Sequence, residues 1–173
     1  MDNEEGTITK DGKLKVEPID PEAQLKRMVI MMGIPRSGKS TVVRDILLSN
    51  GPPYQVVCAD DIRLSMGHQY DIRTEPLVRA VSETMVRAFM VRGLPVIIDS
   101  TNVKSSLLDS WTNMADEFGY AKYIKIVNTS EEECIRRNVG KGSVPADVII
   151  KMSTKLKEIL ETYNFEKKGI SAL

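Results

Sequence analysis

An eight-residue stretch near the start of the chain has the composition of a phosphate-binding loop. Residues 33–40 read Gly-Ile-Pro-Arg-Ser-Gly-Lys-Ser and fit the pattern G-x-x-x-x-G-K-[ST]. The apolar stretch 28–32 precedes them and a helical pattern at 40–48 follows, which is the strand-loop-helix setting that the motif requires. A turn that only caps a helix would explain the two glycines, but it would give no reason for Lys39 and Ser40. The residues therefore predict a P-loop that binds phosphates.

This loop predicts ATP and Mg²⁺ as cofactors. Its glycines let the backbone approach an anion closely, and the first turn of the following helix directs unpaired N–H groups at the phosphates. Lys39 would bridge the β- and γ-phosphates, Ser40 would offer its hydroxyl to Mg²⁺, and Thr41 would support the helix start. The expected nucleotide-binding residues of the loop are Gly33, Ile34, Pro35, Arg36, Ser37, Gly38, Lys39, Ser40 and Thr41.

A carboxylate and an arginine follow the second apolar stretch, 55–59. Phosphoryl transfer to a hydroxyl needs a group that accepts the proton and cations that neutralise the moving charge. Arg63 lies about one helical turn after Asp60, so both side chains can face one ligand. We expect Asp60 to be the general base and Arg63 to hold an acceptor phosphate. Because Asp at such a place commonly N-caps a helix, we assign capping to one of Asp60 and Asp61 and catalysis to the other.

Asp99 ends a further apolar stretch, 96–99. A carboxylate at the end of a strand beside the phosphate loop holds Mg²⁺, usually through water, in many phosphate-loop enzymes. The alternative is a turn residue, because Asp-Ser-Thr-Asn at 99–102 has ideal turn composition. The position favours the metal role, so Ser40 and Asp99 are the predicted metal ligands.

Cations gather around two glycines at 136–142, which read Arg-Arg-Asn-Val-Gly-Lys-Gly. This composition is typical of a mobile lid that closes on ATP, and we place that lid at about 136–145. The alternative is the solvated end of a helix, where the helix dipole favours cations. Arg137 is the stronger candidate, because a guanidinium binds phosphate bidentately. We expect Arg137 to contact the nucleotide together with Lys141, and to complete a catalytic set with Lys39 and Asp60.

Apolar stretches and helical periodicity predict the elements that position these residues. Near-continuous apolar stretches predict strands at 28–32, 55–59, 96–99 and 123–127. Apolar residues at helical spacing predict helices at 40–48, 75–92, around 107–118, at 130–138 and from 145 onward. Such alternation predicts an α/β fold with a four- or five-stranded parallel sheet that is covered on both faces. At its carboxyl edge we expect the loops 33–40, 59–63, 99–102 and 128–130 to converge.

The chain divides into one domain and two short ends. Residues 1–25 are polar and carry Asp-Gly between two short apolar pieces, which predicts a tail or a hairpin. Residues 26–163 form the expected domain, and 164–173 are expected to be a C-terminal tail.

Composition and charge exclude several classes of protein. Lys plus Arg and Asp plus Glu number 24 each, so no bulk attraction to nucleic acid or to an anionic membrane is expected. Cys58 and Cys134 are too few for a disulfide scaffold, and His68, the single histidine, cannot complete a zinc site with them. No apolar run approaches the ~20 residues of a membrane span, and no positively charged signal region opens the chain. We therefore expect a cytoplasmic protein without a membrane partner, and the oligomeric state stays open.

The motifs together resemble the kinase domain of phage polynucleotide 5′-hydroxyl kinases and, more broadly, the P-loop kinases that include zeta toxins and gluconate kinases. The resemblance runs from about residue 28 to 160 and rests on the segments 33–41, 60–63, 97–102, 136–138 and 144–148. It implies a three-layer P-loop kinase sandwich with a helical lid. It also implies that Asp60 is the base, that Arg63 holds the acceptor's 3′ phosphate, and that Thr101 and Asn102 bind substrate.

Three positions depart from the pattern of that family. Arg36 stands where the family usually has glycine, and Asp99 lies one place earlier than the corresponding carboxylate of the phage enzyme. Lys141 replaces the second arginine of the lid. Kinase activity is therefore better supported than the identity of the acceptor.

These features predict an ATP- and Mg²⁺-dependent kinase that phosphorylates a hydroxyl, with the 5′-hydroxyl of DNA or RNA as the first candidate. A hydroxymethylated base in phage DNA, as related phage kinases are thought to use, or the hydroxyl of a sugar or other small molecule is the second. A nucleotide-dependent switch or binding module is an alternative from another class, and it would hydrolyse ATP without stimulation by a hydroxyl acceptor.

Overall fold

Strands and helices alternate along the chain, as the apolar pattern predicts. The computed structural model describes residues 26–49, 53–67, 71–140 and 144–173. In chain order its elements are β1 (Arg27–Met32), α2 (Lys39–Leu48), β2 (Gln55–Cys58), α3 (Ala59–Ser65), α4 (Glu75–Val91), β3 (Val96–Asp99), α5 (Ser105–Phe118), β4 (Ala121–Ile126), α6 (Glu131–Arg137), α7 (Ala146–Thr162), the 3₁₀ helix η1 (Glu166–Lys168) and β5 (Ile170–Ala172). The tail or hairpin expected at 1–25 lies outside the described residues.

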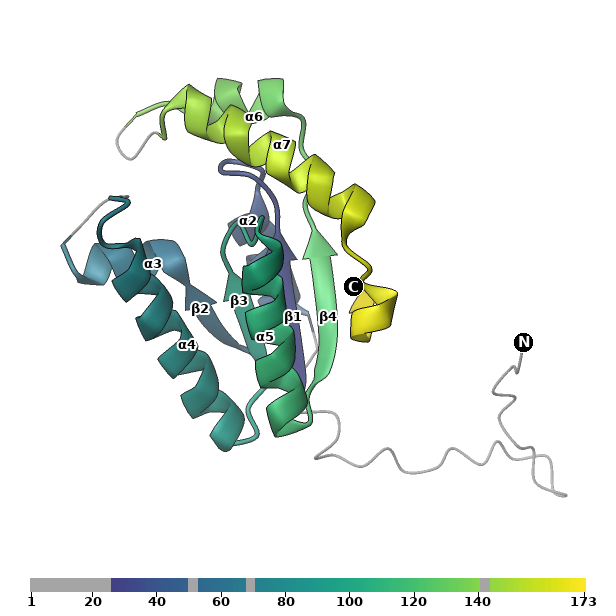
Figure 1. The fold of residues 1–173 in the computed structure, drawn as a ribbon. Coiled ribbons are helices and arrows are strands. Elements are labelled where there is room, and N and C mark those ends of the chain that lie inside the picture. Colours follow the sequence, from purple (N-terminus) through teal and green to yellow (C-terminus); the bar gives the residue numbers. More distant parts are fainter. Residues whose placement is uncertain (1–25, 50–52, 68–70, 141–143) are drawn as a thin grey trace, which may run out of the picture.

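The strands form one five-stranded sheet in the order β2-β3-β1-β4-β5, and every neighbouring pair is parallel (Figure 1). β1 lies at the centre, where Met28 pairs with Val96 on one side and Lys122 on the other. The predicted parallel α/β sheet is confirmed. Because all strands run the same way, the loops that follow β1, β2, β3 and β4 leave from one edge of the sheet.

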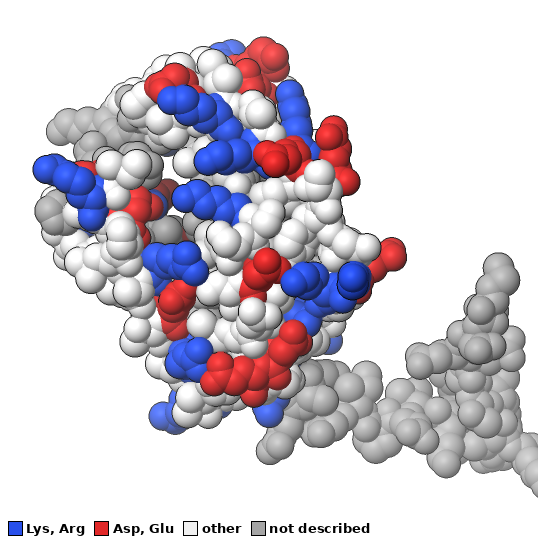
Figure 2. Space-filling model, in the orientation of Figure 1, with Lys and Arg blue, Asp and Glu red and all other residues white. Residues whose placement is uncertain are grey.

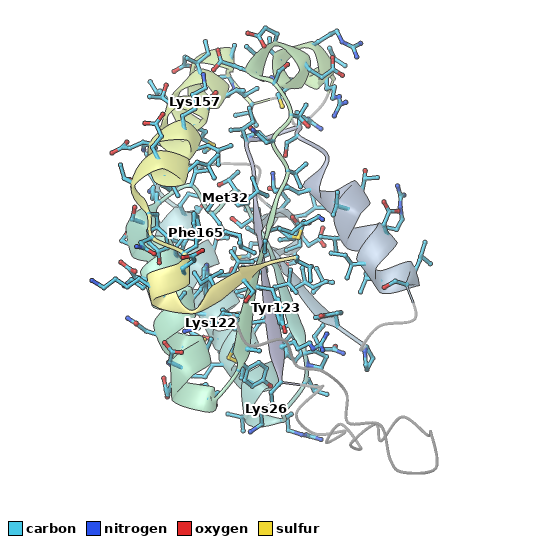
Figure 3. All side chains as sticks on the ribbon, turned by 90° about the vertical axis from the view of Figure 1, so that its right-hand side faces the viewer. Lys26, Met32, Lys122, Tyr123, Lys157 and Phe165 are labelled. Carbon is cyan, nitrogen blue, oxygen red and sulfur yellow. The ribbon has the colours of Figure 1, made fainter. Side chains whose placement is uncertain are left out.

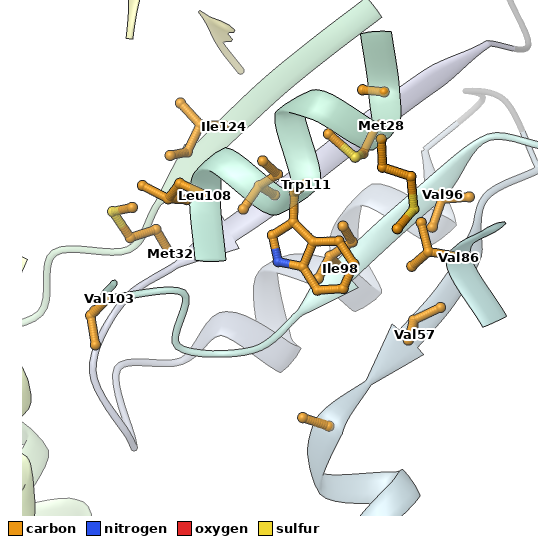
Figure 4. Packing of buried hydrophobic residues seen from close by; sticks show 14 of the residues in the cluster. Met28, Met32, Val57, Val86, Val96, Ile98, Val103, Leu108, Trp111 and Ile124 are labelled. Carbon is orange, nitrogen blue, oxygen red and sulfur yellow. The ribbon is translucent and has the colours of Figure 1, made fainter. Parts of the chain in front are cut away.

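Both faces of the sheet are covered by helices. The side chains of β1 point alternately to opposite faces, so its apolar residues enter a core on each side. Met28, Ile30 and Met32 join the larger core cluster, which also contains buried residues of α4, α5 and α7 (Figure 4). Val29 and Met31 join a smaller cluster with Val43 of α2. The side view shows α2 on one face and α4 and α5 on the other (Figure 3), which gives the three layers predicted from the sequence.

The end of the chain differs from the expected tail. Residues 166–168 form η1, Gly169 turns the chain at φ +64, and Ile170 begins β5, which pairs with β4. Ile170 is buried and belongs to the larger core. A three-residue strand with one large apolar side chain carries too little periodicity for a sequence pattern to reveal it.

The helices α6 and α7 cross the carboxyl edge of the sheet, above the loops that leave it (Figure 1). The predicted lid, at about 136–145, spans the end of α6 and the connection to α7, and its residues 141–143 lie outside the described residues. Among the described residues, no helix is long and apolar enough to cross a membrane.

Candidate active site

The phosphate loop between β1 and α2 is held by close backbone contacts. A Cβ on Gly33 would lie 2.6 Å from the Val127 carbonyl oxygen and 2.8 Å from Ser37 Oγ, so only glycine fits. The Gly33 N–H donates to the Thr101 carbonyl oxygen at 3.2 Å. Gly38 has φ +99, a left-handed conformation, and directly precedes α2. The loop therefore has the tightly turned backbone that anion binding at a helix start requires.

Lys39 and Ser40 begin α2 at the carboxyl end of β3. Lys39 Nζ donates to the Ile34 carbonyl oxygen at 2.9 Å, and Ser40 Oγ donates to Asp99 Oδ2 at 3.0 Å. Burial lowers the pKa of Lys39, although the charge of Asp99 opposes this shift. Burial raises the pKa of Asp99, against the effects of the Ser40 hydrogen bond and of Lys39. Lys39, the predicted phosphate-binding lysine, and Asp99, the predicted metal carboxylate, thus lie in one partly buried cluster.

The oxygen atoms of Ser40 and Asp99 fit a magnesium ion. Mg²⁺ prefers hard oxygen ligands and is commonly held by one or two carboxylates together with substrate phosphates and water. Within residues 26–49, 53–67, 71–140 and 144–173, no group of three or more His, Cys, Asp or Glu side chains could hold a metal by itself. A magnesium ion at this place would therefore depend on the phosphates of the nucleotide.

Asp60 and Asp61 lie in the first turn of α3, and neither is the N-cap. The strand β2 passes directly into α3 at Ala59, with Cys58 as the N-cap and without a side-chain capping bond. The assignment of capping to one of the two carboxylates was wrong, because the helix begins one residue earlier than the strand pattern indicated. Asp61 lines a pocket of about 320 Å³ with Ser40, Cys58 and Asp99. Asp60 is largely exposed, with 89% of its side chain accessible.

Arg63 lies one turn after Asp60 on α3 and is bound by two carboxylates. Its Nη1 donates to Asp60 Oδ1. Its Nε and Nη2 donate to Glu75 Oε1 and Oε2, both at 2.7 Å. The structure brings Asp60 and Arg63 together, as the spacing predicts. Glu75 was missed, because its only sequence signal is an acidic residue at a helix start, which is common for electrostatic reasons alone.

Asn102, an expected substrate-binding residue, is fully buried and has φ +49. Its Nδ2 donates to the Met31 carbonyl oxygen at 2.7 Å, and its Oδ1 accepts from Trp111 Nε1 at 3.1 Å. Both polar atoms of the side chain are therefore bonded within the protein, and the expected role in binding substrate stays a prediction. Thr101 is half-buried, and its backbone carbonyl holds the phosphate loop.

The lid places Arg137 over the phosphate loop. A Cβ on Gly38 would lie 3.8 Å from Arg137 Nη1, and Arg137 Nε donates to Glu133 Oε1 at 2.6 Å. The Arg36 Nε donates to Asn138 Oδ1 at 3.4 Å, which links the phosphate loop directly to the lid. Arg36 has φ +65, the left-handed conformation that explains why glycine is usual there. Lys141 lies outside the described residues.

Thr129 provides a second link to the phosphate loop that the sequence did not indicate. Its Oγ1 donates to the Ser37 carbonyl oxygen at 2.7 Å. The loop 128–130 was expected at this edge, but no motif distinguishes Thr129 within it.

Basic and acidic side chains are interspersed on the face that Figure 2 shows, without one continuous basic surface. The mixed surface agrees with the balanced composition.

Comparisons with known proteins support a kinase-like fold. A family model described as "AAA domain" matches residues 28–161. The structure of a Pnkp1/Rnl/Hen1 RNA repair complex contains a chain with 26% identity and a TM-score of 0.72, over 82% of this chain and 47% of that chain. This protein therefore spans about half the length of that relative.

Two more distant structures are similar in fold alone. A gluconokinase from Sinorhizobium meliloti 1021 has 17% identity and a TM-score of 0.57, over 87% of this chain and 83% of its own. A deoxyadenosine kinase from M. mycoides with bound dATP has 14% identity and a TM-score of 0.54, over 85% and 90%. The predicted P-loop kinase fold is confirmed at the level of this broad group.

Proposed function

The chain belongs to the AAA domain family, and from this premise we propose that it is an ATP-dependent kinase that transfers the γ-phosphate to a hydroxyl group. One observation carries the proposal. The phosphate loop with Lys39 follows β1 and the Asp60–Arg63 pair follows β2, the two strands on either side of β3, so a donor site and an acceptor site adjoin at the same edge of one sheet. A site that only hydrolysed ATP as a switch would not need a carboxylate and an arginine on the acceptor side.

The residues divide the reaction between them. Lys39 and Arg137 would bind the phosphates of ATP, and Ser40 and Asp99 would hold Mg²⁺, which would neutralise charge on the β- and γ-phosphates. The acceptor oxygen attacks the γ-phosphorus and forms the new P–O bond. The bond from the γ-phosphorus to the bridging oxygen breaks, ADP leaves, and the acceptor proton passes to Asp60. Arg63 would position Asp60 and the acceptor.

The 5′-hydroxyl of DNA or RNA is the proposed acceptor. The similarity to a chain of an RNA repair complex supports it, and so does the Asp-Asp-x-Arg segment, which resembles the acceptor motif of polynucleotide kinases. A base hydroxymethyl group or a small-molecule hydroxyl is the second candidate. The engagement of Arg63 by Glu75 favours that candidate, because a neutralised guanidinium attracts an acceptor phosphate less strongly.

Transfer of labelled γ-phosphate from Mg-ATP tests both candidates. The acceptors are matched oligonucleotides with a free 5′-hydroxyl, with a blocked 5′ end, and with a blocked end plus hydroxymethylated bases. Label on the free 5′ end alone is the expected result. Label on the blocked, hydroxymethylated strand would move the acceptor to the base. ATP hydrolysis that no hydroxyl acceptor stimulates would contradict a kinase.

Two variants assign the roles within the reaction. Lys39→Ala should abolish ATP binding and transfer, whereas Asp60→Asn should retain ATP binding and lose about 10²–10⁴-fold in rate, the usual effect of removing a general base. Asp147→Asn, on an exposed carboxylate of α7, is the control. Near-normal turnover by Asp60→Asn would show that the base assignment is wrong.

A further inference from the structure

The contact between Arg63 and Glu75 has a geometry that sets it apart from other ion pairs of α4. Both carboxylate oxygens of Glu75 accept from one edge of the guanidinium, Nε and Nη2, each at 2.7 Å. Such paired, parallel hydrogen bonds fix the plane of a guanidinium as well as its position. A third nitrogen, Nη1, donates to Asp60. Three nitrogens of one side chain are therefore engaged by carboxylates from two helices.

Burial distinguishes this pair from a surface salt bridge. The Arg63 side chain is 14% accessible. Two arginines of α4 are more exposed: Arg79, which pairs with Glu83 of α4, is 48% accessible, and Arg87, which pairs with Glu117 of α5, is 46% accessible. Surface pairs of that kind contribute little to stability and leave the side chains mobile. The hydrogen bonding of Arg63 to the Glu75 carboxylate is the main reason that the pKa of Arg63 is raised. The guanidinium is thus held in one orientation before any acceptor binds.

We propose that Glu75 is a positioning residue of the phosphoryl-transfer site, acting on Asp60 through Arg63. By holding the Nε and Nη2 edge of Arg63, Glu75 directs Nη1 at the carboxylate of Asp60. Asp60 itself is exposed at the start of α3 and would otherwise sample several rotamers. The chain of contacts Glu75–Arg63–Asp60 therefore fixes the general base where the acceptor hydroxyl must lie. This inference rests on the proposed function, since it assigns Asp60 as the base.

A purely structural role for Glu75 is the competing explanation. The pair also ties α3 to the first residue of α4, and this tie would contribute to stability whether or not Asp60 acts in catalysis. The two explanations differ in one respect. Loss of a structural tie would also depend on Arg63, but it would lower stability and disturb the ATP site and the acceptor site together. Positioning of Asp60 predicts a loss of kcat with the KM for ATP unchanged.

The orientation of Arg63 can be measured without any reaction. In ¹⁵N NMR spectra of the full chain, the wild type should give a slowly exchanging Arg63 Nε–H signal, assigned by its loss in Arg63→Ala. Glu75→Ala should bring that signal into fast exchange with water, and Glu75→Gln should retain part of the protection, since the amide oxygen still accepts one hydrogen bond. An Arg63 signal unchanged in Glu75→Ala would overturn the proposal.

Steady-state transfer to a 5′-hydroxyl oligonucleotide tests the consequence for catalysis. Glu75→Ala should lower kcat by roughly 10- to 100-fold with the KM for ATP unchanged, because a small misplacement of a reacting group has effects of this size. Glu75→Gln should lie between Glu75→Ala and wild type. In the Arg63→Ala background, Glu75→Ala should have no further effect on kcat. Glu83→Gln, on the same helix, is the matched control and should match wild type.

The possible results separate the two proposals. An equal loss of kcat from Glu75→Ala with and without Arg63 would show that Glu75 does not act through Arg63 and would contradict the positioning role. A raised KM for ATP in Glu75→Ala would make Glu75 a structural residue. If the wild type labels no 5′-hydroxyl, the proposed acceptor is wrong. The same variants are then compared on the hydroxyl acceptor that is labelled, or on ATP hydrolysis with water as the acceptor, where the same dependence on Arg63 is expected.

Discussion

At the scale of single residues, Asn102 shows how a motif residue can serve the site without facing it. Its side chain joins the end of β1, through Met31, to Trp111 of α5. Its backbone has φ +49, which Asn adopts more readily than other residues with a Cβ. The neighbouring Thr101 carbonyl receives the Gly33 N–H. Asn102 therefore fixes the loop that in turn fixes the phosphate loop.

We expect Asn102→Ala to lower the free energy of unfolding by about 3 kcal/mol. The change leaves the buried Trp111 N–H and Met31 carbonyl oxygen without their partner, and places alanine in a left-handed conformation. Urea unfolding followed by circular dichroism measures the effect. Asn113→Ala, at an exposed position of α5, is the control and should stay within about 0.5 kcal/mol of wild type. A loss equal to that of the control would show that the Asn102 network does not stabilise the loop.

Local motifs explain which site residues could be predicted. The sequence correctly predicted that Lys39, Ser40 and Asp99 lie close together. Each belongs to a loop motif or to the end of a strand, where the backbone fixes the position of the side chain. Glu75 could not be predicted, since its contact with Arg63 depends on how two helices pack. The burial of Asn102 could not be predicted for a similar reason: a spacing does not reveal which side of a loop is buried.

At the scale of elements, α6 holds the lid arginines through one carboxylate. Glu133 accepts hydrogen bonds from Arg136 and, at 2.6 Å, from Arg137. These bonds lower the pKa of Glu133 to about 2. A Glu in an unfolded chain has a pKa of about 4.3. The charged carboxylate is therefore favoured by folding, so its contribution to stability is present above about pH 4.3 and is lost as the pH falls toward 2.

This shift predicts a pH-dependent effect of Glu133→Gln. The variant should have a lower Tm than wild type at pH 7, and the difference should shrink as the pH falls from about 4.5 to about 2, where wild-type Glu133 becomes neutral as well. Because Glu133 is at the surface, the difference should also decrease with added salt. Thermal unfolding of both proteins across this pH range is the measurement. A Tm difference that does not change with pH would contradict the ion-pair explanation.

Elements were predictable where their signal is long, and less so where it is short. The strands 28–32 and 96–99 and the helix 75–92 appear nearly as expected, because buried parallel strands are continuously apolar and long helices repeat their pattern. The direct passage from β2 to α3 at Ala59 was missed, since no turn residue separates the two. β5 is held in place by backbone pairing with β4. Backbone pairing gives little sequence signal in a segment of three residues.

At the scale of the whole molecule, β5 forms one edge of the sheet and covers part of β4. Ile170 is buried against the core, the Leu173 N–H donates to the Ile124 carbonyl oxygen at 3.0 Å, and Lys125 Nζ donates to the Leu173 carbonyl oxygen at 2.9 Å. Without β5, the backbone groups of β4 would form an open edge. Open edges of sheets favour association between chains.

Deletion of residues 169–173 should therefore lower stability and promote aggregation. Burial of one Ile side chain alone contributes about 1.5–3 kcal/mol, so a loss of at least about 2 kcal/mol in the free energy of unfolding is expected. Urea unfolding and light scattering measure the two effects. Ile170→Ala removes the side chain but keeps the edge covered, and should lower stability without increased scattering. Equal scattering by both variants would show that edge pairing is not the protective feature.

The central place of β1 has a consequence for how the molecule reaches its folded state. β1 precedes both of its neighbours by long stretches of chain, since Met28 pairs with Val96 and Lys122. Closing such long loops is slow and entropically unfavourable. The phosphate loop leaves β1 and is braced by Thr101 and Thr129, from the loops after β3 and β4. We therefore expect the loop to take its shape late in folding, so a bound nucleotide should slow unfolding more than it speeds folding.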